Sequence, residues 1–195
     1  MSYSFFALLS RLKLIERWAL MRSVSPENLS DHTVQVAFIA HALALLGNRR
    51  LGKQYCAERV ALLALYHDVT EILTGDMPTP VKYKTETLRS AYKAVERQAA
   101  ARLCEGLPED LREDFSAMLL PGGADEPLLP LIRAADKLSA IIHCIEERKA
   151  GNCEFLSAEK QNLRQLHALN CPEAELFVSE FLEDYHKNLD ELVDF

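Results

Sequence analysis

The sequence predicts an all-α protein, and two observations carry that prediction. Apolar residues recur at spacings of three and four along almost the whole chain, as on the buried face of a helix, and rarely at the spacing of two that is typical of strands. The 7 glycines and 8 prolines stand between these periodic segments rather than inside them. With 195 residues, 49% of them hydrophobic and 26% charged, the chain is expected to form one globular domain over residues 1–195.

The first two predicted helices are separated by an irregular stretch. A helix is expected over about residues 3–15, and the polar stretch RWALMRSVSPENLS follows at residues 17–30. Connectors longer than about a dozen residues are often functional, so this stretch is a candidate functional segment. The second helix is expected to begin after a cap at Asn28 or Ser30 and to end near Gly47.

The rest of the chain alternates predicted helices with turns. A third helix is expected over about residues 57–73 and ends at Gly75, because the two prolines of residues 75–82 impose a turn or an extended segment. The later helices are expected over residues 83–105, shortly after Pro108, and over about residues 126–149, 158–168 and 172–192.

The acidic composition excludes some classes of partner. Lys and Arg number 22 against 29 Asp and Glu, which gives a net charge of −7 and repels nucleic acid polymers and anionic membranes at long range. We therefore expect neither as a partner. A phosphorylated small substrate would need positive charge placed locally at its site.

The cysteines indicate a reducing compartment. There are 5 of them, they are widely spread and they form no CxxC, so neither a disulfide framework nor a zinc knuckle is indicated. The N-terminal apolar run at residues 5–9 is too short for a signal peptide, and no apolar stretch is expected to approach the roughly 20 residues that cross a bilayer. We therefore expect a cytoplasmic protein.

Four polar residues stand on helix faces that should be apolar, namely His32, His67, Asp68 and Asp136. Burying two unpaired carboxylates is costly unless a cation lies between them. Two imidazoles and two carboxylates suit one divalent transition ion, such as Mn²⁺, Co²⁺ or Zn²⁺, better than Mg²⁺, which prefers oxygen ligands alone. Taken singly, each residue is better explained as an ordinary capped or hydrogen-bonded polar side chain.

The ordered pattern His, His-Asp, Asp on successive predicted helices resembles the HD-domain metal-dependent phosphohydrolase superfamily. Several segments spread over most of the chain resemble the sequences of bacterial 5′-deoxynucleotidases of the YfbR type. The resemblance implies an HD-domain helical fold and a metal-dependent phosphomonoesterase that hydrolyses deoxyribonucleoside 5′-monophosphates. The segments that carry it are Arg17-Trp18, SDHTVQVAFIAHAL (residues 30–43), LYHDVTEILTGDMPTPVK (residues 65–82), AADKLSA (residues 134–140) and GNCEFLSA (residues 151–158).

The resemblance also implies roles for particular residues and a homodimer, which the extent of the apolar helix faces favours as well. It implies one metal ion held by His32, His67, Asp68 and Asp136. Glu71 and Arg17 are implied to be catalytic. The residues implied to contact the substrate are Arg17, Trp18, His32, Asp68, Asp76, Met77, Pro78, Thr79 and Asp136.

The chemistry of Glu71 and Arg17 agrees with those roles. Glu71 is four residues after His67 and three after Asp68, so in a continuous helix it would project beside the ion and act as an acid or a base on a nearby water. Arg17 would supply a planar fork of donors matched to phosphate. The alternatives are an exposed helix glutamate at position 71 and a weak surface ion pair of Arg17 with Glu16 or Glu27.

Trp18 and Asp76 are candidates for contacts with the sugar. Trp18 would stack on a base or pack against the sugar and exclude a ribose hydroxyl, or else it anchors its segment to the core. Asp76 would accept a hydrogen bond from the 3′-hydroxyl, or else it only terminates a turn. Four histidines are not candidate ligands by their spacing, namely His41, His143, His167 and His186.

Several related functions remain alternatives at this point. Residues 69–135 contain no histidine, so one ion is expected rather than the two of the dinuclear phosphodiesterases in the same superfamily. A deoxynucleoside triphosphohydrolase, a (p)ppGpp hydrolase and a non-catalytic nucleotide-binding domain are weaker alternatives. Metal stoichiometry and phosphate release would separate them.

Overall fold

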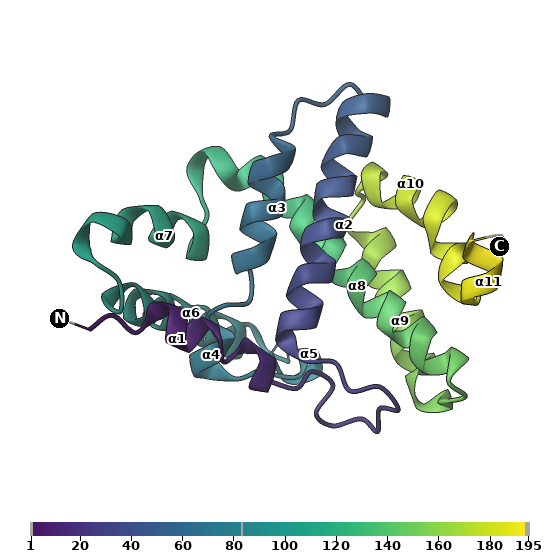
Figure 1. The fold of residues 1–195 in the computed structure, drawn as a ribbon, viewed down its shortest axis with the longest axis horizontal. Helices are drawn as coiled ribbons and strands as arrows, with labels where there is room; N and C mark the ends of the chain where they lie inside the picture. Colours follow the sequence, from purple (N-terminus) through teal and green to yellow (C-terminus); the bar gives the residue numbers. More distant parts are fainter. Residues whose placement is uncertain (1, 83, 194–195) are drawn as a thin grey trace.

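The structure is a computed structural model that describes residues 2–82 and 84–193, apart from the side chains of Thr79 and Pro80. Within that part it consists of helices joined by turns and contains no β-strand, which confirms the predicted all-α class (Figure 1). The α-helices are α1 (Phe5–Leu9), α2 (Leu29–Arg50), α3 (Ala57–Tyr66), α4 (Glu71–Thr74), α5 (Thr79–Lys82), α6 (Glu86–Glu105), α7 (Arg112–Leu119), α8 (Leu129–Lys149), α9 (Leu156–Ala168), α10 (Pro172–Phe181) and α11 (Leu189–Val193), and the 3₁₀ turns are η1 (Leu12–Leu14), η2 (Glu109–Leu111), η3 (Gly123–Leu128), η4 (Cys153–Phe155) and η5 (Leu182–His186).

Helix α2 forms the centre of the main hydrophobic core. It packs against α3 on one side and α8 on the other, and α8 in turn packs against α9 (Figure 1). Several of the buried positions on these helices are alanines, among them Ala40, Ala64 and Ala135, whose small side chains let the helix axes approach closely. Leu43 of α2 and Ile141 of α8 are both fully buried in this core. The site described below lies at one end of these helices.

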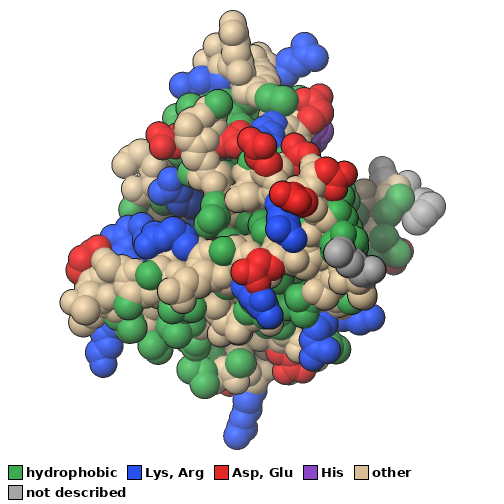
Figure 2. All heavy atoms as spheres, turned by 90° about the vertical axis from the view of Figure 1, so that its left-hand side faces the viewer, with side chains coloured by type: hydrophobic (Ala, Val, Ile, Leu, Met, Phe, Trp, Pro, Cys, Tyr) green, Lys and Arg blue, Asp and Glu red, His purple; other side chains and the backbone are tan. Residues whose placement is uncertain are grey.

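A second, smaller core joins the N-terminal segment to α6 and α7. Phe5 is 1% exposed, and its ring meets the edge of Phe115 with centroids 4.9 Å apart. Val69, from the turn after α3, is buried in the same cluster and ties that turn to α6. The side of the molecule that carries α7 faces the viewer in Figure 2, where hydrophobic side chains lie scattered between charged ones.

The predicted start of α2 is confirmed, but its predicted end is wrong. Asn28 caps the helix, since its Oδ1 accepts hydrogen bonds from the backbone N–H of Ser30 and Asp31 at 2.9 and 3.1 Å. The helix runs through Gly47 to Arg50. Gly47 is required for close packing rather than for termination, because a Cβ there would lie 2.7 Å from the ring of Tyr55.

Three other predicted helices are shorter than expected. Residues 3–15 form only α1 and a 3₁₀ turn, and residues 172–192 break after Phe181 into a 3₁₀ turn whose Leu182 packs against the main core. Helix α6 begins at Glu86, because Thr85 caps it by accepting a hydrogen bond from Leu88 N at 3.1 Å. The predicted start of this helix at Tyr83 lies outside the described residues.

Helix α2 also departs from the expectation that no segment is suited to a membrane. It has 22 residues, and its most apolar window of 18 residues has a mean hydropathy of 1.3, enough by length and composition alone to cross one. In the fold, 56% of its most apolar window is buried inside the protein. That degree of burial is typical of a core helix, and the apolar character of α2 is explained by its central position.

Candidate metal centre and active site

The helix predicted over residues 57–73 is interrupted, and the interruption builds the site. Helix α3 ends at Tyr66, a tight turn follows, and α4 begins at Glu71. Within the turn His67 Nδ1 bonds Ala64 O at 2.7 Å, while Val69 packs into the second core at 1% exposure. The prediction of one continuous helix is therefore wrong, because the tertiary packing of Val69 outweighs the helical periodicity of the sequence.

Both histidines of the site are held with the same ring nitrogen free. Ser139 donates its hydroxyl proton to Gln35, with 2.6 Å between the oxygens, so its Oγ accepts from His32 Nδ1 at 3.0 Å. His67 Nδ1 donates to the carbonyl oxygen of Ala64, which can only accept. The proton therefore lies on Nδ1 in both rings. Each Nε2 keeps its lone pair, and both Nε2 atoms are buried without a hydrogen-bond partner.

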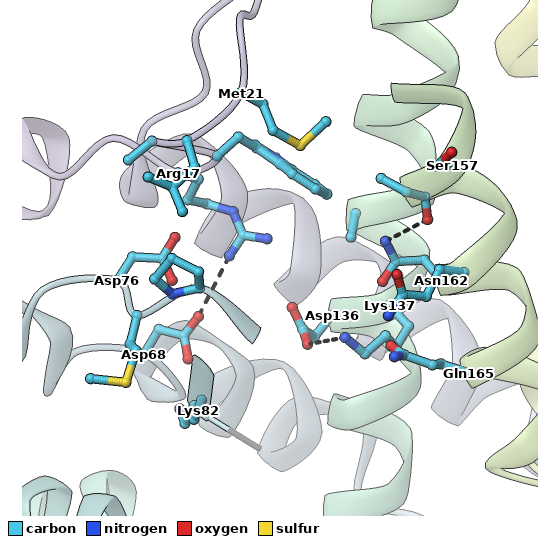
Figure 3. A pocket seen from close by; sticks show the side chains of 18 of the residues that line it. Arg17, Met21, Asp68, Asp76, Lys82, Asp136, Lys137, Ser157, Asn162 and Gln165 are labelled. Carbon is cyan, nitrogen blue, oxygen red and sulfur yellow. Dashed lines mark hydrogen bonds and ion pairs between the residues drawn. The ribbon is translucent and has the colours of Figure 1, made fainter. Parts of the chain in front are cut away.

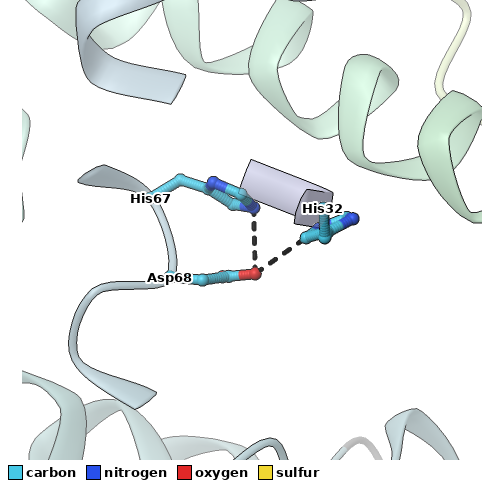
Figure 4. A group of neighbouring side chains, drawn as sticks. All are labelled: His32, His67 and Asp68. Carbon is cyan, nitrogen blue, oxygen red and sulfur yellow. Dashed lines mark ion pairs between the residues drawn. The ribbon is translucent and has the colours of Figure 1, made fainter. Parts of the chain in front are cut away.

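The two free nitrogens point to one place, where a carboxylate meets them (Figure 4). Asp68 Oδ2 lies 2.9 Å from His67 Nε2 and 3.7 Å from His32 Nε2. The ligand atoms of the three side chains all lie within 4.8 Å of one another. Two unprotonated imidazole nitrogens and a carboxylate at this spacing fit a divalent transition ion.

Asp136 stands beside this group on α8. Its Oδ1 is 3.3 Å from His32 Nε2, although it does not belong to the set of mutually close ligand atoms. Burial would raise the pKa of Asp136, but the adjacent His32, followed by the charges of Lys137 and Arg17, outweighs burial and lowers it. Burial is opposed in the same way at Asp68, where His67 lowers the pKa to about 2. Both carboxyl groups are thus ionised, as ligands must be.

Glu71 is buried next to the group and has an unsatisfied oxygen. Its side chain lines the same pocket as Asp68, it is 6% exposed, and its Oε2 has no hydrogen-bond partner. Burial, followed by the charges of Asp68 and Asp76, raises the pKa of Glu71 to about 10. A buried carboxyl group with a raised pKa and an unused oxygen is suited to exchanging a proton.

Arg17 and Trp18 are joined to the site by Glu27. Arg17 Nε and Trp18 Nε1 both donate to Glu27 Oε2 at 2.9 Å, and Arg17 Nη1 reaches to 3.9 Å from Asp68 Oδ2. The Arg17–Glu27 pair is 12% and 9% exposed, so it is a part of the site rather than the weak surface pair considered above. Trp18 stacks on His143, with ring centroids 5.6 Å apart, and also lines the pocket.

A pocket of about 900 Å³ connects these residues and continues to α9. Figure 3 shows Arg17, Asp68 and Asp76 on one side of it and the side chains of α9 on the other. The predicted contacts Asp76, Met77 and Pro78 line it, whereas the side chain of Thr79 lies outside the described part of the structure. His32 and His67 stand behind the wall of the pocket, next to Asp68.

The sequence interpretation missed several of the residues that line this pocket. Lys82 is held at its wall by an ion pair with Glu96, at 2.7 Å, and by the ring of Tyr92. The position of Lys137 directly after Asp136 was a signal that could have identified it. The far wall carried no sequence signal, because an amphipathic helix such as α9 is expected to turn its polar face to solvent. The other missed residues include Arg133, Ser157, Gln161, Asn162 and Gln165.

Comparisons with known proteins show the family of this chain. The family model of YfbR-like 5′-deoxynucleotidases matches residues 4–185. A 5′-deoxynucleotidase from Vibrio parahaemolyticus is 47% identical over 96% of this chain and 97% of its own length. An HD-domain phosphohydrolase from Listeria innocua superposes with a TM-score of 0.81 at 22% identity, covering 93% of this chain and 88% of that one.

A third protein, from Magnetospirillum magnetotacticum, is described as a predicted metal-dependent phosphohydrolase. It is 26% identical and superposes with a TM-score of 0.62 over 95% of this chain and 93% of its own. The coverage shows that the likeness extends over the whole helical unit and not only over the candidate metal centre. The predicted family, HD-domain fold and enzyme class are confirmed, and the chain belongs to the YfbR-like 5′-deoxynucleotidases, which are hydrolases.

Proposed function

We propose that this 5′-deoxynucleotidase hydrolyses deoxyribonucleoside 5′-monophosphates at the end of the pocket where His32, His67 and Asp68 meet. The observation that carries the proposal is the convergence of two unprotonated Nε2 atoms on a carboxylate that also faces the Arg17 guanidinium at 3.9 Å. A cation site beside a guanidinium is what hydrolysis of a phosphate ester requires of a protein. The name of the family supports the same class of substrate.

We assign His32, His67, Asp68 and Asp136 as the ligands of one divalent ion. When bound, such an ion neutralises phosphoryl oxygens and lowers the pKa of water. The nitrogen and oxygen donors suit Co²⁺, Mn²⁺ or Zn²⁺, and the phosphate-release panel described below distinguishes among these three. The His32–Ser139 and His67–Ala64 hydrogen bonds hold both rings ready for coordination.

Arg17 and Glu71 have separate tasks in this proposal. Arg17, oriented by Glu27, binds the phosphate and aligns it for in-line attack by water. Glu71 takes or supplies the proton that moves between the attacking water and the leaving 5′ oxygen, and its unpaired Oε2 is available for that exchange. The new bond joins the water oxygen to phosphorus, and the bond from phosphorus to the 5′ oxygen breaks.

The nucleoside lies in the part of the pocket that leads to α9. Trp18 and Asp76 line the pocket, and we propose that they meet the sugar, with Met77 and Pro78 beside them. Three side chains of α9 at the far wall are amides, namely Gln161, Asn162 and Gln165, and amides carry both donors and acceptors. Groups of this kind can pair with any base, so they support acceptance of several bases.

A phosphate-release panel tests the function. Deoxy- and ribonucleoside 5′- and 3′-monophosphates and deoxynucleoside triphosphates would be offered to the metal-stripped protein with Mn²⁺, Co²⁺, Zn²⁺ or Mg²⁺ added in turn. We expect inorganic phosphate from the deoxy 5′-monophosphates with a transition ion. Release of triphosphate instead would support the triphosphohydrolase alternative, and binding without release would support a non-catalytic domain.

Replacing Trp18 by alanine is expected to weaken discrimination against ribonucleotides. If the indole blocks the space next to C2′, removing it raises kcat/KM for ribonucleoside 5′-monophosphates about tenfold relative to the deoxy substrates. Steady-state kinetics on matched pairs such as dAMP and AMP measure the ratio. Trp18→Phe keeps a ring there and serves as the control. A ratio that stays the same in Trp18→Ala would exclude the steric role.

The remaining expectations from the sequence concern the environment and the assembly. We propose a cytoplasmic homodimer. All five cysteines are free, which supports a reducing compartment. An apolar stripe on α2, in which Phe38 is 74% exposed and Val34 46%, supports an interface with a second copy. Light scattering at several protein concentrations measures the assembly, and a monomer at all of them would contradict the dimer.

A further inference from the structure

The segment that carries Arg17 and Trp18 has no helix or sheet of its own between residues 15 and 28, so something else must hold it. Its base is fixed by Arg17 N, which donates to Glu27 O at 2.9 Å. Its tip is fixed by Glu147 of α8, whose carboxylate accepts from Val24 N at 2.9 Å and from Ser25 N at 2.8 Å. Glu147 is 1% exposed and lies outside the pocket.

Asn152 completes this attachment. Its Nδ2 donates to Arg22 O and to Glu147 Oε2, both at 2.7 Å, so one amide group joins the segment to the carboxylate. Gly151 has a φ of +86°, a conformation that glycine adopts readily and that turns the chain back after α8. Residues 151 and 152 belong to the GNCEFLSA text noted in the sequence, to which the proposed reaction gives no role. We call Glu147 and Asn152 the clamp.

Glu147 is ionised in this arrangement. Burial disfavours the ionised form, but the hydrogen bonds from Val24, Ser25 and Asn152 outweigh burial and lower the pKa of Glu147. Because this buried carboxylate accepts hydrogen bonds from two backbone N–H groups of the segment and from Asn152, it contributes to the placement of the segment. Glu147 does not line the pocket, so it has no direct contact with a substrate bound there.

The backbone of Trp18 shows why firm attachment is needed. Its φ is +60°, in the left-handed region that residues other than glycine rarely adopt. Such a conformation persists only where the surrounding structure fixes it. Glu27, His143 and Phe155 hold the Trp18 side chain, and Met21 N bonds Trp18 O at 2.7 Å. The clamp holds the same loop four to seven residues further along the chain.

We propose that Glu147 and Asn152 are positioning residues that set the placement of Arg17 and Trp18 and through them the binding of substrate. The inference rests on the proposed function, because it takes these two side chains as the groups that meet the phosphate and the sugar. The clamp itself touches neither substrate nor ion. Its loss should therefore change substrate binding and selectivity while ion binding stays as it was.

The single tryptophan of the chain allows a direct test, because all tryptophan fluorescence comes from Trp18. In Glu147→Ala and Asn152→Ala we expect emission shifted to longer wavelength and faster quenching by acrylamide. We also expect KM for a deoxynucleoside 5′-monophosphate to rise about tenfold, with a smaller change in kcat and reduced selectivity against ribonucleotides. Glu147→Gln keeps the shape and one acceptor oxygen and should restore part of each property. Ion stoichiometry should equal that of the wild type.

Glu146→Ala is the matched control, since Glu146 is the neighbouring, exposed glutamate of α8. It should leave emission and kinetics unchanged. Unchanged Trp18 emission in both clamp variants, at wild-type helix content by circular dichroism, would overturn the inference. A rise in KM without any change at Trp18 would overturn it too.

Arg17→Ala and Trp18→Ala separate this inference from the function on which it rests. If these variants keep wild-type KM and selectivity, the proposed substrate contacts are wrong. A shifted emission in Glu147→Ala would then still support placement of the segment by the clamp. If they lose binding while the clamp variants keep both emission and KM, the clamp is wrong and the substrate contacts stand.

Discussion

Replacing Asp68 by alanine is expected to abolish ion binding and phosphate release together. Asp68 Oδ2 is the meeting point of the site, 2.9 Å from His67 Nε2, 3.7 Å from His32 Nε2 and 3.9 Å from Arg17 Nη1. Its removal leaves two imidazoles and Asp136, and it also removes the negative charge that faces Arg17. Without the carboxylate that they share, the three remaining ligands should not retain an ion through dialysis.

Metal analysis after dialysis and a phosphate-release assay measure the two effects on the same sample. Asp110→Ala is a suitable control, because Asp110 is an exposed acid on η2. It should keep both ion and activity. Turnover by Asp68→Ala after treatment with a chelator would show that the reaction does not depend on this centre. Activity lost with full ion occupancy would move Asp68 from ion binding to another task.

Glu71→Gln is expected to retain the ion and lose about 10²- to 10⁴-fold in kcat, the usual range for a positioned acid or base. Gln has nearly the shape of Glu, so the pocket and KM should change little. It cannot exchange a proton, which is the property that the buried, unpaired Oε2 of Glu71 supplies. Single-turnover kinetics with the ion-loaded protein would measure the step, and a near-normal rate would remove Glu71 from the mechanism.

The same substitution has a second effect in the ion-free protein. Burial raises the pKa of Glu71 from 4.5 to about 10, so the folded state binds this proton more tightly than the unfolded chain does. The resulting stabilisation is complete below the unfolded pKa and is lost as the pH rises towards the folded one, by up to about 1.4 kcal/mol per pH unit. Glu71→Gln lacks this loss.

The difference in Tm between Glu71→Gln and the wild type, both stripped of ions, should therefore grow from about pH 5 to about pH 9 in favour of the variant. Thermal unfolding followed by circular dichroism measures it. Other groups titrate in this range as well, but they are present in both proteins and cancel in the difference. A difference independent of pH would mean that Glu71 is ionised in the ion-free fold.

Much of the fold followed from periodicity, and the failures have identifiable physical causes. The spacing of apolar residues predicts the helices and Asn28 predicts the start of α2, because both signals are local. The break at His67 is different. Residues 57–73 keep a helical pattern throughout, and only the packing of Val69 against residues far along the chain decides the interruption. The sequence of residues 57–73 alone does not predict that long-range contact.

The site was predicted to a similar extent. Polar residues on apolar faces identify His32, His67, Asp68 and Asp136 as unusual, and the family resemblance gives them a common purpose that their spacing alone does not. From sequence, Glu27 is expected only as a surface partner of Arg17, because burial of that pair depends on how the segment folds back onto α8. From sequence, the polar face of α9 is expected to face solvent, because the sequence does not place this helix at the wall of the pocket.

The hydrogen bonds from His32 to Ser139 and from Ser139 to Gln35 form one continuous chain. It joins α2 to α8 and fixes the imidazole before any ion arrives. On the proposed assignment the apoprotein is already preorganised, so loading costs little rearrangement and one metal can exchange for another without refolding. Which element such a centre carries then depends on cellular supply as much as on the ligands.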